Sequence, residues 1–251
     1  MKRNLVVHAQ YDAQRRELEA FLQAFHTSGT YVAQGERNSI KKDTFSGEML
    51  SIKKFKTPNV LQGLIYRFFR KSKAKRSFQY ANKLISVGLH TPFPVAYMEK
   101  FKLGLAESFY VSRHLEYDLD FRVLNHNPRY PNREEILRQF AQFTFRLHEN
   151  GIEFLDHSPG NTLIAHRGDG TYVFYLIDLN RMRFGEMDFH QRMKNFRRLW
   201  LSKTMINIIS KEYSQLYGKS EEETHRLLTF YSRKFQRKKN VKKIRKRKWG
   251  I

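Results

Sequence analysis

The sequence predicts an α+β protein with two lobes, a small antiparallel β lobe with helices and a mainly helical C-terminal lobe. Short β-type runs separated by turn residues fill Thr30 to Lys56. The character of the chain changes after Leu115, which predicts a hinge, and an apolar pattern of helical period follows from Ile136 to Leu147. We therefore expect four parts: an N-terminal strand-helix extension at 1–29, a β lobe at 30–114, a helical lobe at 115–232 and a basic tail at 233–251.

The composition is that of a globular chain. At 251 residues, with 40% hydrophobic and 14% aromatic residues, it can bury a full core. The absence of cysteine excludes disulfides and thiolate metal sites. No apolar run approaches the roughly 20 residues of a membrane span, and Met1 to His8 is too short for a signal peptide. We therefore expect a cytoplasmic protein.

The charge balance predicts a polyanionic partner. Lys and Arg number 47 against 24 Asp and Glu, which gives a net charge of +23. A field of this sign attracts nucleic acid or an anionic membrane surface. Composition alone does not choose between them.

The β lobe offers candidate phosphate contacts. Strands are expected at 31–34, 39–44 and 48–55, after a short strand at 4–8 and a helix at 12–25. The turn between the first two strands of this group would supply Gly35, Arg37 and backbone amides to an anion. A single glycine is also compatible with an ordinary hairpin.

A strand lysine is the second candidate. Lys53 and Lys54 lie on opposite faces of their strand because side chains alternate with period two. An inward-pointing lysine is costly to desolvate unless it meets an anion, so we assign Lys53 as a phosphate contact. The alternative is that both lysines are solvated at a sheet edge.

Two basic segments carry apolar residues. Val60 to Phe69 has an amphipathic pattern and runs into a cluster of Arg and Lys that continues to Arg76. The tail from Arg233 combines lysines and arginines with Ile244, Trp249 and Ile251. Both patterns are typical of an anionic membrane surface. The alternatives are packing on the small lobe for the first and a disordered solubilising tail for the second.

The helical lobe is expected to begin with a long helix. Asn132 is the predicted N-cap residue and Glu135, three residues on, its reciprocal partner in a capping box. A further helix is predicted from Ser220, whose following glutamates suit a helix N-terminus.

Two acids and an amide lie at the ends of a predicted hairpin. Asp156 and Asn161 are separated by four residues, and Asp178 ends an apolar β run 17 residues after Asn161. Phosphoryl transfer uses a carboxylate beside the acceptor hydroxyl together with an amide and a second carboxylate that bind magnesium. We assign Asp156 as the base and Asn161 and Asp178 as Mg²⁺ ligands. Asp, Asn, Pro and Gly also favour turns for backbone reasons, so a purely structural role is the alternative.

Four stretches carry a family resemblance: LSIKKF at 50–55, VGLHTPFPVAY at 87–97, LHENGIEFLDHSPGN at 147–161 and LIDLNRMRF at 176–184. With them the chain resembles the lipopolysaccharide kinase family, the kinases of Kdo (3-deoxy-D-manno-octulosonic acid) and of core heptose. The resemblance implies a two-lobed protein-kinase-like fold, ATP and Mg²⁺ as cofactors, and a lipid A-linked Kdo or heptose acceptor. It also implies a location on the inner face of the inner membrane.

The chain departs from the kinase pattern at two positions. Phe154-Leu155-Asp156 stands where protein kinases have His-Arg-Asp, so the arginine that receives an activation-loop phosphate is missing. No acid lies between Lys71 and Val87 to pair with Lys53, and Gln79 is the nearest polar candidate. A pseudokinase scaffold therefore stays open.

The sequence leads to an ATP-dependent kinase of a sugar hydroxyl in the lipopolysaccharide inner core. A RIO-like protein serine/threonine kinase is the second interpretation. A basic nucleic-acid-binding protein is the third, but no RNA-binding motif supports a nucleic-acid partner.

Overall fold

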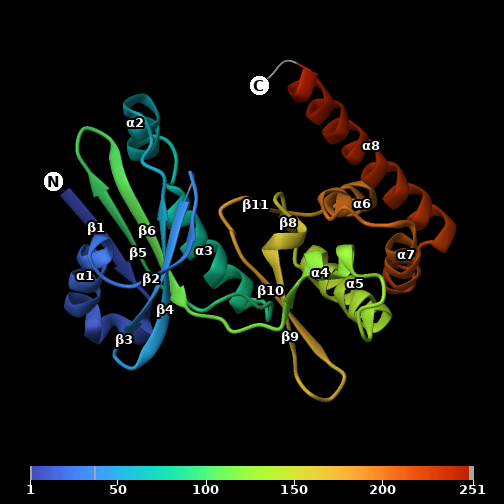
Figure 1. Ribbon diagram of the computed structural model, residues 1–251, viewed down its shortest axis with the longest axis horizontal. Coiled ribbons are helices and arrows are strands. Elements are labelled where there is room, and N and C mark those ends of the chain that lie inside the picture. The colour runs from blue at the N-terminus through green and yellow to red at the C-terminus, as the bar shows by residue number, and fades with distance from the viewer. Residues whose placement is uncertain (1, 37, 249–251) are drawn as a thin grey trace. The chain divides into compact units, whose positions relative to one another are not determined.

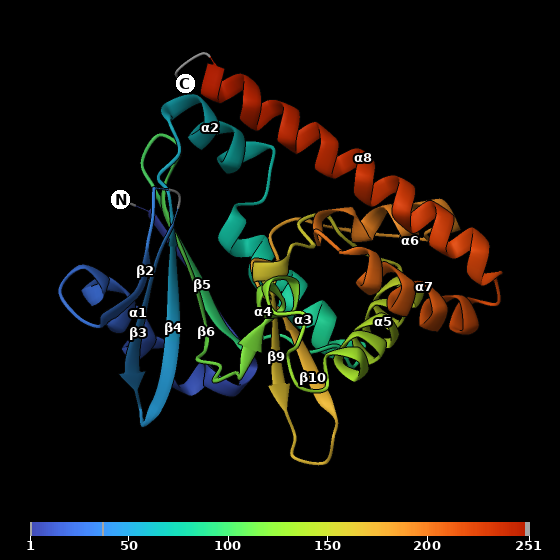
Figure 2. The same cartoon turned by 45° about the vertical axis from the view of Figure 1, so that its right-hand side comes forward.

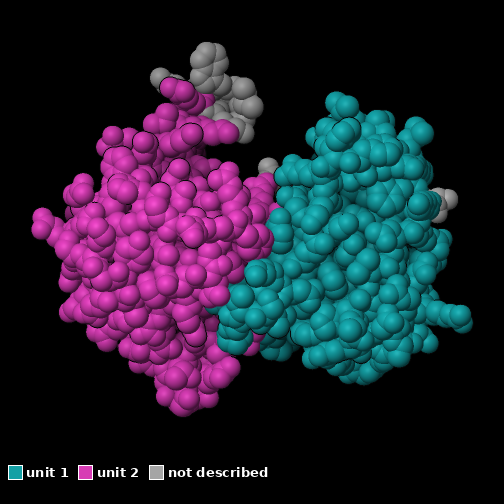
Figure 3. Space-filling model, turned by 180° about the vertical axis from the view of Figure 1, so that it is seen from behind, with its two compact units in different colours: residues 1–116 teal, residues 117–251 magenta. Residues whose placement is uncertain are grey.

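The computed structural model describes residues 2–36 and 38–248. Internal contacts divide them between two compact units, residues 1–116 and 117–251 (Figure 3). The four-part division expected above stays a prediction, and the units are described one at a time.

Unit 1 is built on a six-stranded sheet in the order β1-β5-β6-β4-β3-β2 (Figure 1). Every neighbouring pair is antiparallel. The first strand along the chain is thus an edge of the sheet, beside β5. The elements are β1 (Lys2–Val7), the 3-10 turns η1 (Ala9–Gln14) and η2 (Ala24–His26) on either side of α1 (Arg15–Gln23), β2 (Thr30–Gln34), β3 (Asn38–Phe45), β4 (Glu48–Phe55), α2 (Val60–Phe68), α3 (Lys73–Ser86), β5 (Pro94–Phe101) and β6 (Leu105–Arg113).

The two faces of this sheet carry different helices. Leu50 and Ile52 of β4 are buried with Leu18 and Leu22 of α1. Phe55 is instead buried with residues of α3. Because β4 alternates strictly, Lys54 shares the α1 face with Ile52 and Lys53 shares the α3 face with Phe55.

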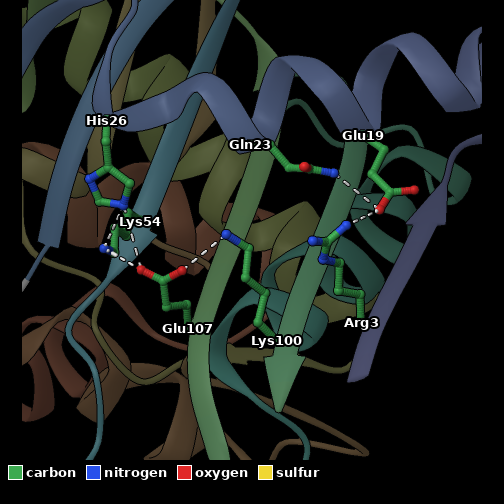
Figure 4. Close-up of polar contacts among 7 residues, drawn as sticks. All are labelled: Arg3, Glu19, Gln23, His26, Lys54, Lys100 and Glu107. Carbon is green, nitrogen blue, oxygen red and sulfur yellow. Dashed lines mark hydrogen bonds and ion pairs between the residues drawn. The ribbon is translucent and has the colours of Figure 1, made fainter. Parts of the chain in front are cut away.

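An ion cluster lies on the α1 face (Figure 4). Glu107 accepts from Lys54 at 2.6 Å and from Lys100 at 3.0 Å. Burial raises the pKa of Glu107, but the hydrogen bonds from these lysines outweigh it and lower the pKa to about 2. Lys54 therefore has a structural role.

Unit 2 is mainly helical. Its elements are β7 (Leu119–Asp120), α4 (Phe121–His126), α5 (Arg133–Glu149), β8 (Ile152–Phe154), the 3-10 turns η3 (Pro159–Asn161) and η4 (Phe196–Arg198), β9 (Thr162–His166), β10 (Tyr172–Leu176), β11 (Met182–Phe184), α6 (Phe189–Asn195), α7 (Lys203–Tyr217) and α8 (Glu221–Lys248). Strands β9 and β10 form an antiparallel hairpin with β7 on its outer side, and α5, α7 and α8 pack in succession (Figure 2).

The core of unit 2 explains the long helix α5. Its apolar side chains Ile136, Phe140, Phe143 and Leu147 are fully or almost fully buried. Phe140 and Phe143 stack against Phe174 of β10 at 5.6 and 5.4 Å between ring centroids. This packing joins the helix that precedes the Asp156 loop to the hairpin that follows it.

The predicted capping box at Asn132 is wrong. Asn132 has a left-handed backbone with φ of 54°, so its side chain does not cap the helix and lies 3.4 Å from the Tyr172 hydroxyl. An N-cap residue normally has an extended backbone, which aims its side chain at the third amide of the helix. Glu135 instead accepts from Gln139 at 2.8 Å.

The C-terminal helix α8 includes most of the basic tail. Ser220 caps it by accepting from the Glu223 amide at 3.1 Å. Leu227 and Leu228 are buried in the first half of the helix, whereas Val241 and Ile244 are exposed in its second half. Trp249 and Ile251, part of the predicted membrane segment, lie outside the described residues.

None of the helices within residues 2–36 and 38–248 combines the length and the apolar character that crossing a bilayer requires.

Candidate active site

A short loop in unit 2 carries Asp156 between β8 and η3. The loop begins in register because β8 pairs with β11, and the Leu155 amide donates to the Arg181 carbonyl at 3.0 Å. It ends in a turn closed by the Asn161 amide, which donates to the Ser158 carbonyl at 2.9 Å. Both ends of the loop are therefore fixed by backbone hydrogen bonds.

Hydrogen bonds connect two of the three predicted site residues of this unit and reach the sequence neighbour of the third. Asn161 Nδ2 donates to the Asp156 carbonyl at 2.9 Å. The Asn161 carbonyl accepts from the Ile177 amide at 3.0 Å, and Asp178 follows directly. The structure thus brings Asp156, Asn161 and the start of the Asp178 segment together within unit 2.

Asp178 is held in an uncommon conformation. Its φ is 57°, the left-handed region that a non-glycine residue seldom occupies. The buried side chain of Asn180 donates to Asp178 Oδ1 at 2.6 Å. Such strain persists where the surroundings determine it, and it is concentrated at functional sites.

Two arginines meet the carboxylate of Asp156, whose side chain is 17% exposed. Arg198 Nη2 lies 2.7 Å from Oδ1, and Arg181 Nη1 lies 3.6 Å from Oδ2. Arg198 also lies over the Phe235 ring of α8, 5.7 Å from its centroid. Oδ1 is therefore tightly paired, whereas Oδ2 has the longer contact with the more exposed arginine.

The loop is supported from its buried side by a network of buried side chains. His148 of α5 contacts the Tyr213 hydroxyl at 2.8 Å through Nδ1 and the Asn195 Oδ1 at 3.1 Å through Nε2. Asn195 in turn donates to the Phe154 carbonyl at 2.9 Å. Complete burial lowers the pKa of His148 to about 3, so the ring is neutral. Helices α5, α6 and α7 thus fix the strand that leads into Asp156.

The next residue, His157, is packed as an apolar ring. It is fully buried against Phe140, Phe154 and Phe196, at 5.6, 5.7 and 6.4 Å between centroids. Neither ring nitrogen forms a hydrogen bond with a residue that the structure describes. Burial lowers the pKa of His157 to about 4, and the nearby Asn195 side chain offsets only part of this effect.

A glycine lets an arginine cross the loop. A Cβ on Gly160 would lie 1.9 Å from Arg122 Nη2, a distance at which atoms overlap. Arg122 is anchored to Asp120 at 3.1 Å and belongs to the first turn of α4. A side chain at position 160 would therefore displace the Arg122 guanidinium group from the loop.

The predicted nucleotide contacts lie in unit 1. Lys53 is on the α3 face of β4, with its Nζ 5.4 Å from the centroid of the Phe55 ring. Gln79 of α3 accepts from Lys71 at 2.9 Å. The pairing of Gln79 with Lys53 therefore stays a prediction, as does the phosphate role of Lys53.

The turn between β2 and β3 does not require a glycine for steric reasons. A Cβ on Gly35 would meet only the Asn38 carbonyl, at 3.8 Å, which is ordinary van der Waals contact. Gly35 lines a hollow of about 170 Å³ with Lys54 and Lys56. Arg37, the other predicted anion donor of this turn, lies outside the described residues.

The residues of unit 2 fit a magnesium ion bound together with phosphates. Among the described residues there is no cluster of three or more His, Cys, Asp or Glu side chains able to hold a metal alone. Mg²⁺ commonly takes one or two carboxylates and completes its oxygen shell with substrate phosphates and water. Asp178 supplies a carboxylate. The bond from Asn161 to Asp156 uses the side-chain nitrogen, so Oδ1 is the atom that would coordinate a cation.

Several residues of the site were missed by the sequence analysis. Asn180 and Arg181 belong to the quoted LIDLNRMRF stretch, and a signal for them was present in the polar pair after Asp178. Arg198, Asn195 and His148 reach the loop through tertiary packing. No local spacing in the sequence predicts such contacts.

The chain is similar to known kinases in sequence and in fold. The model of the lipopolysaccharide kinase (Kdo/WaaP) family matches residues 52–231, well over half of the chain. No curated protein sequence matches. Among solved structures, "WaaP in complex with acyl carrier protein" has a TM-score of 0.66 at 18% identity and covers 93% of this chain and 98% of its own. A MAP kinase from Leishmania major has a TM-score of 0.45 at 18% identity, covering 80% and 60% of the two chains.

Proposed function

Because the chain belongs to the lipopolysaccharide kinase (Kdo/WaaP) family, we propose that it is an ATP- and Mg²⁺-dependent kinase of a Kdo hydroxyl in a lipid A precursor. Family membership implies phosphotransferase activity and the use of ATP. The expected α+β kinase-like fold is confirmed by the likeness to WaaP. The observation that carries the assignment of residues is the hydrogen-bonded link from Asp156 through Asn161 to Ile177, beside Asp178.

Asp156 is proposed as the residue that orients the acceptor hydroxyl and takes its proton. A general base must come within hydrogen-bond reach of that proton. Its Oδ1 is engaged by Arg198 at 2.7 Å, so the hydroxyl would approach Oδ2, where Arg181 lies 3.6 Å away. The buried network behind Phe154 would keep the carboxylate in position while the hydroxyl binds.

Asn161 and Asp178 are proposed as the Mg²⁺ ligands and Lys53 as a nucleotide-phosphate contact. Bound magnesium neutralises the charge that develops on the phosphates during transfer. Asn180 would orient the Asp178 carboxylate through its 2.6 Å hydrogen bond. Gly35, Arg37 and Gln79 complete the proposed nucleotide contacts, and the steric freedom at Gly35 makes it the weakest of them.

The arginines beside the base favour an acidic acceptor. Arg181 is 54% exposed and its guanidinium group is 3.6 Å from the base, so it can turn towards an anion without losing a close ion pair. Arginine binds carboxylates with two parallel hydrogen bonds. Kdo carries a carboxylate, whereas heptose does not, and this difference is why we propose Kdo ahead of core heptose.

The site of action is proposed to be the inner face of the inner membrane. A lipid A-linked acceptor is presented there among phosphates and anionic lipids. A net charge of +23 would draw the protein to such a surface.

The test is transfer of labelled phosphate from ATP to purified acceptors. We expect label on Kdo-lipid A and, with Asp156→Ala, loss of turnover with ATP binding largely retained. Arg181→Gln should raise the KM for Kdo-lipid A more than it lowers kcat, because the arginine is proposed to hold the acceptor. Turnover that persists in Asp156→Ala would remove the base from the mechanism.

The other readings predict different labelling. Label on the heptose of a core acceptor would mean that heptose, and not Kdo, is the substrate. Label on a generic protein would select the RIO-like kinase. ATP binding with no transfer to any acceptor would select the pseudokinase scaffold.

A further inference from the structure

Helix α2 of unit 1 packs against the sheet through a glycine and leaves most of its large apolar side chains exposed. Its only buried residue among those described is Gly63. A Cβ on Gly63 would lie 2.9 Å from the Leu105 carbonyl, and one on Gly104 would lie 2.4 Å from Gly63 itself. The helix therefore meets the β5–β6 turn backbone against backbone, without apolar side chains between them.

Three apolar side chains of α2 point away from that contact, whereas Leu64 is half-buried. Leu61 and Ile65 are two residues before and after Gly63, so at 3.6 residues per turn they lie roughly 160–200° from it. Phe68 lies on the same side. Leu61 is 70% exposed and Phe68 is 65% exposed, and Phe69, which ends the helix, is 87% exposed. We call Leu61, Ile65, Phe68 and Phe69 the α2 stripe.

The helix is fixed firmly in this orientation. Asn59 caps it by accepting from the Gln62 amide at 2.9 Å. Arg67 donates to the carbonyls of Lys102 and Leu103 at 2.7 and 2.8 Å. Two strong anchors thus hold the apolar stripe outward, although an amphipathic helix usually turns its apolar face to the core.

Positive charge is concentrated at the C-terminal end of the α2 stripe. Beyond Phe69, a hollow of about 380 Å³ is lined by Arg67, Arg70, Lys71 and Lys75, with Glu99 as its acid. On the other side of the helix, Val60 and Leu103 line a second hollow with Lys102 and Glu107, so the excess of positive charge lies on the Phe69 side. Leu103 is itself 77% exposed, so the apolar surface continues onto the β5–β6 turn.

We propose that the α2 stripe docks into an anionic lipid surface, with phosphate headgroups against the flanking arginines and lysines. Apolar side chains that insert beside cations are the pattern of interfacial helices. The sequence alone left packing on the small lobe as an equal alternative, and the glycine contact removes it. The docking surface deepens the proposed function by naming what the kinase binds while it reaches a lipid-linked acceptor.

The test measures partition of the full chain onto vesicles that contain no sugar acceptor, in the absence of ATP. Phosphatidylcholine vesicles are compared with vesicles that also contain phosphatidylglycerol. We expect binding to the anionic vesicles, weakened by high salt. The variant Leu61→Ser/Phe68→Ser/Phe69→Ser should lower the partition coefficient at least tenfold.

A matched control uses exposed apolar residues elsewhere. Met49→Ser/Leu216→Ser/Phe230→Ser removes side chains that are 41–52% exposed and should leave partition within about twofold of wild type. Arg70→Gln/Lys102→Gln should weaken binding to anionic vesicles only. An α2 stripe variant that binds as wild type does would overturn the proposal and leave the stripe to a protein partner.

A second measurement records a gain of signal on binding, so it does not depend on a variant that has lost vesicle binding. In Phe68→Trp, tryptophan emission should shift to shorter wavelength when anionic vesicles are added, relative to wild type under the same conditions. An unchanged difference spectrum would also overturn the proposal. Because neither ATP nor acceptor is present, failure here leaves the kinase assignment intact, and failure of the labelling test leaves the docking surface intact.

Discussion

Acid should destabilise unit 2 through its two buried histidines. Burial lowers the pKa of His148 to about 3 and that of His157 to about 4, against 6.5 in the unfolded chain. The unfolded state therefore binds more protons below pH 6.5, so stability rises with pH in this window and falls on acidification. At pH 5 each ring costs about 2 kcal/mol, which is 1.5 pH units at 1.36 kcal/mol each. Together they remove about 4 kcal/mol from a typical total of 5–15 kcal/mol.

The variant His157→Phe isolates one of these contributions. The ring of His157 already lies among Phe140, Phe154 and Phe196, and its nitrogens form no hydrogen bond with a described residue. Phenylalanine should therefore fit, with stability at pH 7.5 equal to or above that of wild type. The variant cannot titrate at this position, so its advantage should grow by about 1.4 kcal/mol per pH unit below pH 6.5, until about pH 4.

Urea unfolding at a series of pH values measures this difference. Groups other than His157 titrate in both proteins and cancel in the comparison, provided that the slope of the free energy with urea is the same. Above pH 7 the two curves should be parallel. Parallel curves between pH 6.5 and pH 5 would refute the argument, because they would mean that His157 accepts a proton in the folded state as readily as in the unfolded state.

Three further changes test other parts of the molecule. Asn180→Ala removes the hydrogen bond that orients Asp178, so the apparent affinity for Mg²⁺, measured by metal titration, should fall about 10- to 100-fold. Glu107→Gln leaves two lysines without their counterion and should cost about 2 kcal/mol in urea unfolding at pH 7. That difference from wild type should shrink as the pH falls from 5 towards 2, where the folded carboxylate is protonated. Gly104→Ala would drive a Cβ into Gly63 and should cost about 1–3 kcal/mol in the same assay.

Local patterns were enough to predict strands of unit 1 and to place Lys53 and Lys54 on opposite faces of one strand. Strand β4 was expected at 48–55 and begins and ends there. Period two separated Lys53 from Lys54, and the structure accounts for Lys54 by its ion pair with Glu107. Such features depend on neighbours in sequence or on the pleat of one strand, both of which a sequence records.

Features that depend on distant partners could not be predicted in this way. Arg198 reaches Asp156 from 42 positions along the chain, and no spacing near the loop predicts their 2.7 Å contact. The predicted helix at 12–25 is interrupted by 3-10 turns on both sides of α1. The stripe of α2 has the period of a core-facing helix, and only the glycine contact with the β5–β6 turn reveals that it faces outward.

The support around Asp156 separates neutral from charged contacts, and the separation has a physical reason. Behind the loop, His148, Asn195 and Tyr213 are buried, and a charge on any of them would carry a large desolvation cost. Arg192 joins them by a hydrogen bond with Tyr213, and its charge is paired with Glu149. On the other side, Arg181 and Arg198, whose side chains are 54% and 29% exposed, contact the carboxylate. Added salt screens exposed charges and leaves buried neutral hydrogen bonds almost unaffected. Salt should therefore weaken acceptor binding through the arginines while the geometry of the loop, and with it the position of the proposed base, is retained.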